Sequence, residues 1–183
     1  MTTVFIGGSR AISRLTSIVR SKLDDLMDRK CTILVGDANG ADKAVQEHLA
    51  QRAYNRVIVY CMDHVRNNLG GWPTKQTSRP GARKDFAYYA AKDFAMVEDA
   101  NCGVLLWDGK SKGTLNSAQH LLARGKKTLV YFAPEKTFHK LTSEHDLEEL
   151  LKGCNEEDIQ AARRHIQAKI PASNQIPRQA QRS

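Results

Sequence analysis

The sequence lacks the patterns that identify membrane-inserted, secreted and disulfide-rich proteins. No apolar run approaches the roughly 20 residues that a helix needs to cross a bilayer. The first residues, MTTVFIGG, have no basic segment followed by a longer apolar one, so we expect no secretory signal and a cytoplasmic location. The four cysteines lie far apart and form no C-x-x-C pair, which favours small buried thiols over disulfides or a zinc site.

Standard metal and nucleotide fingerprints are also missing. The six histidines form no H-x-E or H-E-x-x-H arrangement, so we expect no metal and no other cofactor. The stretch GGSRAIS lacks G-x-G-x-x-G, which argues against a dinucleotide dehydrogenase. A GKS tripeptide begins at Gly109, but no glycine lies five residues before it, so we exclude a P-loop ATPase.

The formal net charge of +8 is concentrated at one end of the chain. Five basic residues and no acidic ones follow Gln160, which leaves a formal charge of +3 on the rest. This distribution is weak evidence for a face that binds nucleic acid, whereas a modestly positive body still attracts a phosphorylated small molecule. We therefore expect a nucleotide-type small molecule as the partner, with nucleic acid less favoured and no membrane.

Short apolar runs alternate with amphipathic stretches along most of the chain. The runs predict strands at 3–8, 31–36, 56–61, 102–107 and 127–132, and the amphipathic stretches predict helices at 15–27, 40–53, 82–100 and 114–125. The strands are apolar throughout, as is typical of a sheet covered on both faces. The predicted class is α/β, a three-layer open sheet of about five mostly parallel strands with helices on both faces, plus C-terminal helices.

The domain organisation follows from where this alternation weakens. Residues 1–135 form one predicted nucleotide-binding domain, and 136–170 a helical extension of it, with helices expected at 143–153 and 155–170. The last stretch, 171–183, has little apolar content and is expected to be a flexible basic tail.

Three predicted strands end in glycine-rich polar loops, namely GGSR, GDANGAD and WDGKSKGT. The carboxyl ends of parallel strands share one edge of a sheet, and N–H groups at helix starts favour anions there. The alternative is that short strand–helix turns need glycine anyway. The candidate nucleotide- or phosphate-binding residues are Gly7, Gly8, Ser9, Arg10, Gly36, Asp37, Gly40, Asp42, Asp108, Gly109, Ser111, Lys112, Gly113 and Thr114. For Asp42, pairing with the helix dipole and contact with a ribose are both open.

Residues before the fourth strand add further candidates. Arg83 and Lys92 would reach toward the same edge, although a solvated surface position is the alternative. Trp72 lies in the long loop after the third strand, where it would stack on a base as part of a lid. In the following helix, the side chains at helical spacing are interpreted as core rather than as a base platform: Phe86, Tyr89, Ala90, Phe94 and Val97.

The ordered set GGSR (7–10), GDANGAD (36–42), AKDFAMVEDAN (91–101) and GKSKGTLNSA (109–118) resembles the SLOG superfamily. These are Rossmann-like domains named after DNA-processing protein A and the Lonely-guy phosphoribohydrolases, and the resemblance is greatest to small stand-alone bacterial or phage members. It spans about residues 3 to 132. It implies a five-stranded Rossmann-like sheet that binds a nucleotide or a nucleotide-derived signal.

One departure from the hydrolases of this group bears on chemistry. Their motif P-G-G-x-G-T-x-x-E ends in a catalytic glutamate, and Ser117 occupies that position here, while Gly113 and Thr114 are retained. Asp108, Asp85 or Asp93 would have to supply the carboxylate, and Asp108 before a glycine is typical of a turn.

Three functions follow from this comparison. The leading hypothesis is a domain that binds or senses a nucleoside monophosphate, an ADP-ribose-like molecule or a signalling nucleotide. A nucleotide N-glycosidase and a single-stranded DNA-binding protein are the alternatives, and whether the chain is an enzyme stays open. Homo-oligomerisation is a further expectation for such domains.

Overall fold

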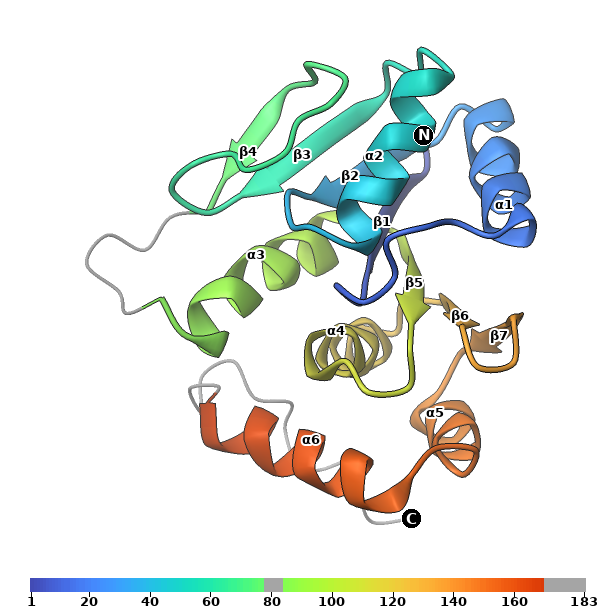
Figure 1. Cartoon of the computed structure of the whole chain (residues 1–183), viewed down its shortest axis with the longest axis vertical. Coiled ribbons are helices and arrows are strands. Elements are labelled where there is room, and N and C mark those ends of the chain that lie inside the picture. The colour runs from blue at the N-terminus through green and yellow to red at the C-terminus, as the bar shows by residue number, and fades with distance from the viewer. Residues whose placement is uncertain (78–83, 170–183) are drawn as a thin grey trace.

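The computed structural model describes residues 1–77 and 84–169, which form a single mostly parallel sheet covered by helices (Figure 1). The elements in chain order are β1 Thr3–Gly8, α1 Ser17–Asp28, β2 Thr32–Gly36, α2 Ala41–Gln51, β3 Val57–Cys61, β4 Thr74–Gln76, α3 Phe86–Asp99, β5 Cys102–Trp107, α4 Lys112–Ala123, β6 Thr128–Phe132, β7 Thr137–Leu141, α5 Glu144–Leu151 and α6 Glu156–Lys169. The strand order is β4-β3-β2-β1-β5-β6-β7, and only β7 pairs antiparallel in this described sheet.

The two faces of the sheet are covered by different helices. Val4 and Ile6 of β1 pack with residues of α1 and α2, whereas Phe5, between them, packs with residues of α3 and α4. Successive strand residues point to opposite faces, so an unbroken apolar strand serves both cores. Helices α5 and α6 pack against α4 and extend the second core outward (Figure 1). The predicted three-layer α/β class is confirmed.

The sheet is larger than the five strands predicted. β4 adds an edge of three exposed residues within the expected loop 62–81. At the other edge, β7 follows a tight turn and returns antiparallel to β6, so the expected helical extension 136–170 begins with a strand. Both strands are short and lie at edges, where one side needs no partner and the apolar pattern is weak.

The start of α3 also differs from the prediction. The helix begins at Phe86 rather than at 82, because the Asp85 carboxylate accepts a hydrogen bond from the Tyr88 N–H and caps the first turn. Arg83 lies outside the described residues, as does the predicted tail 171–183. In the described part of the chain, no helix is both long and apolar enough to span a bilayer.

The strand order places a crevice at the carboxyl end of β1. From β1 the chain moves outward to β2 on one side, and β5 later pairs with β1 on the other side. Neighbouring crossovers diverge at this point, so the loops after β1 and β5 separate and leave a crevice, which is where open α/β sheets bind ligands.

Candidate functional site

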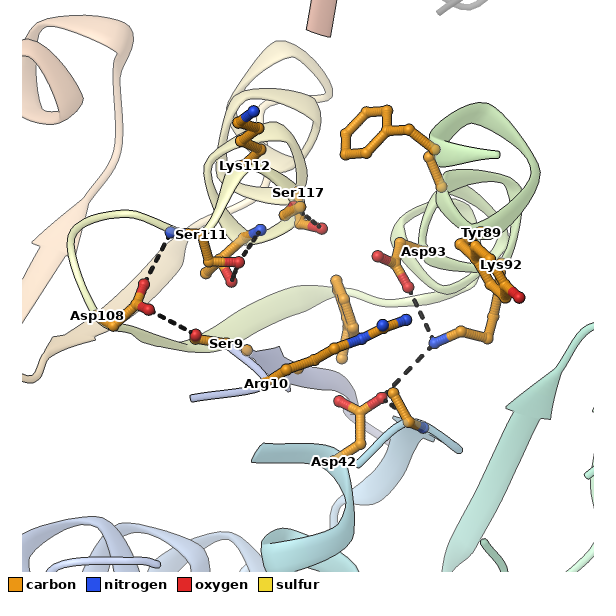
Figure 2. Close-up of a pocket in the computed structure, with 18 of the residues that line it drawn as sticks. Ser9, Arg10, Asp42, Tyr89, Lys92, Asp93, Asp108, Ser111, Lys112 and Ser117 are labelled. Carbon is orange, nitrogen blue, oxygen red and sulfur yellow. Dashed lines mark hydrogen bonds and ion pairs between the residues drawn. The ribbon is translucent and has the colours of Figure 1, made fainter. Parts of the chain in front are cut away.

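A cavity of about 540 Å³ opens in this crevice (Figure 2). Its walls come from the loops after β1, β2 and β5, from the first turn of α4, and from one face of α3. The lining residues are Phe5, Gly7, Gly8, Ser9, Arg10, Ala38, Asp42, Arg66, Phe86, Tyr89, Ala90, Lys92, Asp93, Asp108, Lys110, Ser111, Lys112, Gly113, Thr114 and Ser117. Five cations and three carboxylates lie among them, so the lining favours an anionic ligand.

The structure brings most of the predicted site residues together in this cavity. Those that line it are Gly7, Gly8, Ser9, Arg10, Asp42, Lys92, Asp93, Asp108, Ser111, Lys112, Gly113 and Thr114. Those that do not are Gly36, Asp37, Gly40, Gly109 and Trp72. All three glycine-rich loops contribute, although the loop after β2 contributes through Ala38 and Asp42 rather than through its glycines.

The first turn of α4 forms an anion cradle, defined here as residues 111–114. The Ser111 hydroxyl caps the helix by accepting from the Thr114 N–H at 3.4 Å. The N–H groups of Lys112 and Gly113 have no acceptor among the described residues, as expected at a helix start. A Cβ on Gly113 would meet nothing within 4 Å, so open space lies beside this turn, and residues 111–114 line the cavity. The cradle therefore combines two unused N–H donors with the helix dipole.

Asp108 shapes the loop that leads into this cradle. Its Oδ1 accepts hydrogen bonds from the N–H groups of Lys110 at 3.1 Å and Ser111 at 2.8 Å, and its Oδ2 accepts from the Ser9 hydroxyl at 2.8 Å. Both oxygens thus hold the loops after β1 and β5 in place (Figure 2). This is the turn role that an Asp-Gly pair predicts, and it leaves Asp108 poorly placed as a catalytic base.

A buried charged triad forms one side of the cavity (Figure 2). The Lys92 ammonium lies 3.7 Å from Asp42 Oδ2 and 3.0 Å from Asp93 Oδ1. Burial alone would lower the pKa of Lys92, but the carboxylates of Asp93 and Asp42 raise it above its usual value, so the lysine is charged. Burial raises the pKa of Asp42 to about 6 even though Lys92 opposes the rise.

Gly36 and Gly40 serve this arrangement from outside the cavity. A Cβ on Gly36 would lie 2.2 Å from both Lys92 Nζ and Asp42 Oδ2, so only glycine lets the ion pair cross the end of β2. Gly40 has a φ of +84° and its Cα lies against the backbone of Arg10. Both glycines therefore have a packing reason, and neither lines the cavity.

Two arginines lie close to the same aromatic ring at the cavity wall. The guanidinium carbons of Arg10 and Arg66 lie 5.8 Å and 5.5 Å from the centre of the Tyr89 ring. Figure 2 shows Arg10 reaching from the first loop across the cavity toward the side of Tyr89 and Lys92. Arg10 has no carboxylate within 4 Å in the described structure, and it is exposed. The positive charge of Arg10 is therefore available to an anion that enters the cavity.

The long loop after β3 is anchored and brings Arg66 to the site. Arg66 donates to both oxygens of Asp37, at 2.6 Å and 3.1 Å, and its N–H donates to the same carboxylate. Burial alone would raise the pKa of Asp37, but these hydrogen bonds hold it below its usual value. Asp37 is 1% exposed, so it positions Arg66 instead of contacting a ligand.

Trp72 lies in the core rather than in a lid. Its side chain is 7% exposed, packs with the cluster beneath α2, and donates from Nε1 to the Tyr54 carbonyl at 2.7 Å. The amide of Asn68 brackets the backbone of Trp72 with two further hydrogen bonds. The expected stacking of Trp72 on a base is therefore not compatible with this position.

Sequence reasoning missed several residues that line the cavity. They are Phe5, Ala38, Arg66, Phe86, Tyr89, Ala90, Lys110 and Ser117. The helical spacing predicts a core role for Phe86 and Tyr89; both are half-buried and line the cavity, and Phe86 also packs against the core. One sequence feature could have indicated this position for Tyr89. Asp93 follows Tyr89 by four residues, so the two share one face of α3, and a charged residue on that face argues against full burial in the core.

The catalytic options within the cavity are few. The Ser117 hydroxyl donates to the Gly113 carbonyl at 3.0 Å, the residue is 2% exposed, and a serine has no carboxylate to act as a base. Asp93 is the carboxylate that no backbone N–H or hydroxyl group engages in the described residues, and its side chain is 26% exposed. In residues 1–77 and 84–169, no three His, Cys, Asp or Glu side chains gather in a way that would hold a metal ion.

Comparison with known proteins adds a likeness of fold. No protein-family model and no curated protein matches the chain. A solved structure of DNA processing protein A from Helicobacter pylori, described for its single-stranded DNA binding mode, matches with a TM-score of 0.59 and 16% identity, over 92% of this chain and 81% of that chain. The chain is therefore similar to DNA processing protein A in its Rossmann-like fold, and at this identity the likeness is one of fold alone.

Proposed function

We propose that the protein binds a nucleotide-type ligand in the crevice at the end of β1, as a sensor or binding domain. A phosphate group of the ligand occupies the anion cradle at 111–114. The observation that carries this proposal is the meeting of three glycine-rich loops around unused helix N–H donors and an uncompensated arginine. Backbone donors at a helix start and a guanidinium are the groups that bind phosphate most directly.

The aromatic wall supports a nucleotide over a simple phosphate. Phe86 and Tyr89 line the cavity from α3, and the cradle lies across from them on α4. Aromatic rings offer flat apolar faces on which a base stacks. A cavity of about 540 Å³ falls in the range of roughly 300–1,000 Å³ that small-molecule sites occupy.

The contacts made by the carboxylates of the site favour binding of the ligand without its cleavage. Asp108 is engaged through both oxygens, and Asp42 is buried against Lys92. Asp93 also lines the cavity, and its Oδ1 is paired with Lys92. Glycoside hydrolysis typically needs two carboxylates placed on either side of the scissile bond, or one that activates water.

Single-stranded DNA binding is the second candidate function, and the fold likeness to DNA processing protein A favours it. DNA would also present phosphates to the cradle and bases to Tyr89. Binding of single-stranded DNA should depend more strongly on salt than binding of a nucleotide, because each phosphate neutralised by the protein adds to the salt dependence. It should also depend on the length of the oligonucleotide.

Calorimetric titration tests the proposal with nucleoside monophosphates, ADP-ribose and cyclic nucleotides, and with the matching nucleosides as controls. We expect binding of at least one phosphorylated ligand and none of its nucleoside. No binding of any of them would refute the proposal. Fluorescence anisotropy with single-stranded oligonucleotides at two salt concentrations separates the second candidate, and chromatography for released free base tests cleavage.

A further inference from the structure

The face of α3 that lines the cavity carries an aromatic ring followed one turn later by an acid. Phe86, Tyr89 and Asp93 recur at spacings of three and four residues, so they lie along one face of the helix. Figure 2 shows Asp93 between Ser117 of α4 and Tyr89. Asp93 therefore lies between the cradle, where phosphate would bind, and the ring, where a base would stack.

One oxygen of Asp93 is available to a ligand. Oδ1 pairs with Lys92 Nζ at 3.0 Å, while Oδ2 has no donor within hydrogen-bond distance among the described residues. Figure 2 shows one carboxylate oxygen joined to Lys92 and the other turned toward the α4 side of the cavity. An ionised carboxylate only accepts hydrogen bonds, so this oxygen can accept one from a ligand donor in place of water, and it repels a second phosphate.

We propose that Asp93 accepts a hydrogen bond from a ribose hydroxyl, so that the site selects ribonucleotides over deoxyribonucleotides. The inference rests on the proposed nucleotide function. The sugar is the part of a nucleotide that connects phosphate to base, and its hydroxyls are the donors nearest to both. A carboxylate that binds a ribose hydroxyl is a common device in Rossmann-like sites, although there it follows a strand rather than lying within a helix.

Lys92 and Asp42 position Asp93 for this contact. The buried Lys92 ammonium fixes Oδ1, and Asp42 holds Lys92 from the opposite side. A partner group whose rotamer is fixed gives up little entropy when the ligand arrives. A site with a fixed acceptor also rejects a ligand that lacks the donor, because the acceptor is then left unpaired.

The test compares the 5′-monophosphates of adenosine, guanosine, cytidine and uridine with their 2′-deoxy and 3′-deoxy counterparts by calorimetric titration. For the ribonucleotides that bind, we expect at least one deoxy form to bind roughly 10- to 100-fold more weakly. In Asp93→Ala, the ribonucleotide should fall to the affinity of that deoxy form, while the deoxy form keeps its own affinity. Asp25→Ala, which removes an exposed acid of α1, is the matched control and should leave both affinities unchanged.

Each of the other outcomes would overturn either the ribose proposal alone or the nucleotide function together with it. Equal binding of ribose and both deoxyribose forms by the wild-type protein would overturn the ribose proposal and leave the nucleotide site intact. A similar loss for all ligands in Asp93→Ala would show that Asp93 only supports Lys92, and would overturn the proposal in the same way. Binding of none of these ligands would remove the nucleotide function and the ribose proposal with it.

Discussion

The ammonium of Lys92 lies 3.7 Å from the carboxylate of Asp42, and both side chains are almost wholly buried. The pair joins α3 to the start of α2 directly over Gly36, at the edge of the candidate cavity. Because a buried charge is tolerated only with a partner, each residue of the pair depends on the other. The pair therefore links the stability of the fold to the shape of the site.

Removing the lysine should destabilise the protein strongly. In Lys92→Met the side-chain volume is nearly kept, but Asp42 remains buried without its partner. We expect the free energy of unfolding to fall by about 3–5 kcal/mol, measured by urea denaturation at pH 7. Lys127→Met, at an exposed position, is the matched control and should change it by less than about 0.5 kcal/mol. A loss below about 1 kcal/mol in Lys92→Met would contradict the assigned pairing.

The pH dependence of the free energy of unfolding should reveal the ionisation of the Asp42 carboxyl group. Its pKa in the folded protein is about 6, above the ordinary 3.8, and it is faced by Lys92, Asp93, Asp37 and the Ala38 N–H. Between these two values the unfolded chain loses the proton first, so the contribution of Asp42 to stability falls as pH rises from 4 to 6.

The variant Asp42→Asn removes this titration. The stability of the wild-type protein relative to Asp42→Asn should therefore drop by roughly 3 kcal/mol between pH 4 and pH 7. Denaturation of both proteins across that range measures the difference. A difference that stays constant would show that folding leaves the pKa of Asp42 unshifted, and one that rises with pH would show that folding lowers it; either contradicts the raised pKa.

An acid placed in the anion cradle should separate binding from folding. Gly113 lies in the first turn of α4 with open space beside it. Gly113→Asp adds an acid where the helix dipole favours one, so thermal stability should be unchanged or slightly higher. The same carboxylate adds a negative charge beside the proposed phosphate position, and we expect at least a roughly 100-fold loss of nucleotide affinity in calorimetric titration.

Gly113→Ala is the control for this substitution. It adds only a methyl group and no charge, so it should fold normally and retain affinity within about tenfold. If Gly113→Asp binds nucleotides as well as Gly113→Ala does, phosphate does not occupy the cradle.

Trp72 should contribute to stability and not to binding. Trp72→Phe removes the hydrogen bond from Nε1 to the Tyr54 carbonyl and shrinks a buried side chain. We expect a loss of about 1–3 kcal/mol in the free energy of unfolding with ligand affinity unchanged. Urea denaturation and calorimetry on the same sample measure both. Lower affinity with unchanged stability would instead place Trp72 in a lid.

The central sheet and its loops could be predicted from the sequence because local signals agree with the fold. β1, β2, β3, β5 and β6 are continuous apolar runs, and each buries both of its faces. The helix predicted at 143–153 is found as α5, and Ser143 and Asp146 form a full capping box at its start, a pattern that is visible in the sequence itself. Such elements can be predicted from the sequence because their local conformational preference agrees with their tertiary packing.

The edges of the sheet and the walls of the cavity could not be predicted because they depend on distant contacts. Arg66 reaches the site only because Asp37, 29 positions earlier, holds its guanidinium. Tyr89 follows the apolar spacing of a core helix, yet it meets two arginines at a crevice that only the strand order creates. Glycines are ambiguous for the same reason, since Gly36 makes room for an ion pair between two other elements.

The most direct test of the central claim follows the backbone N–H groups of Lys112 and Gly113 by two-dimensional NMR while a nucleoside monophosphate is added. We predict that these two resonances shift most strongly and saturably, because their N–H groups would donate to phosphate, while that of Gly125, just past the far end of α4, stays in place. The matching nucleoside should leave all three unchanged. Saturable shifts elsewhere, with the Lys112 and Gly113 resonances unmoved, would contradict the claim that this cradle binds the phosphate.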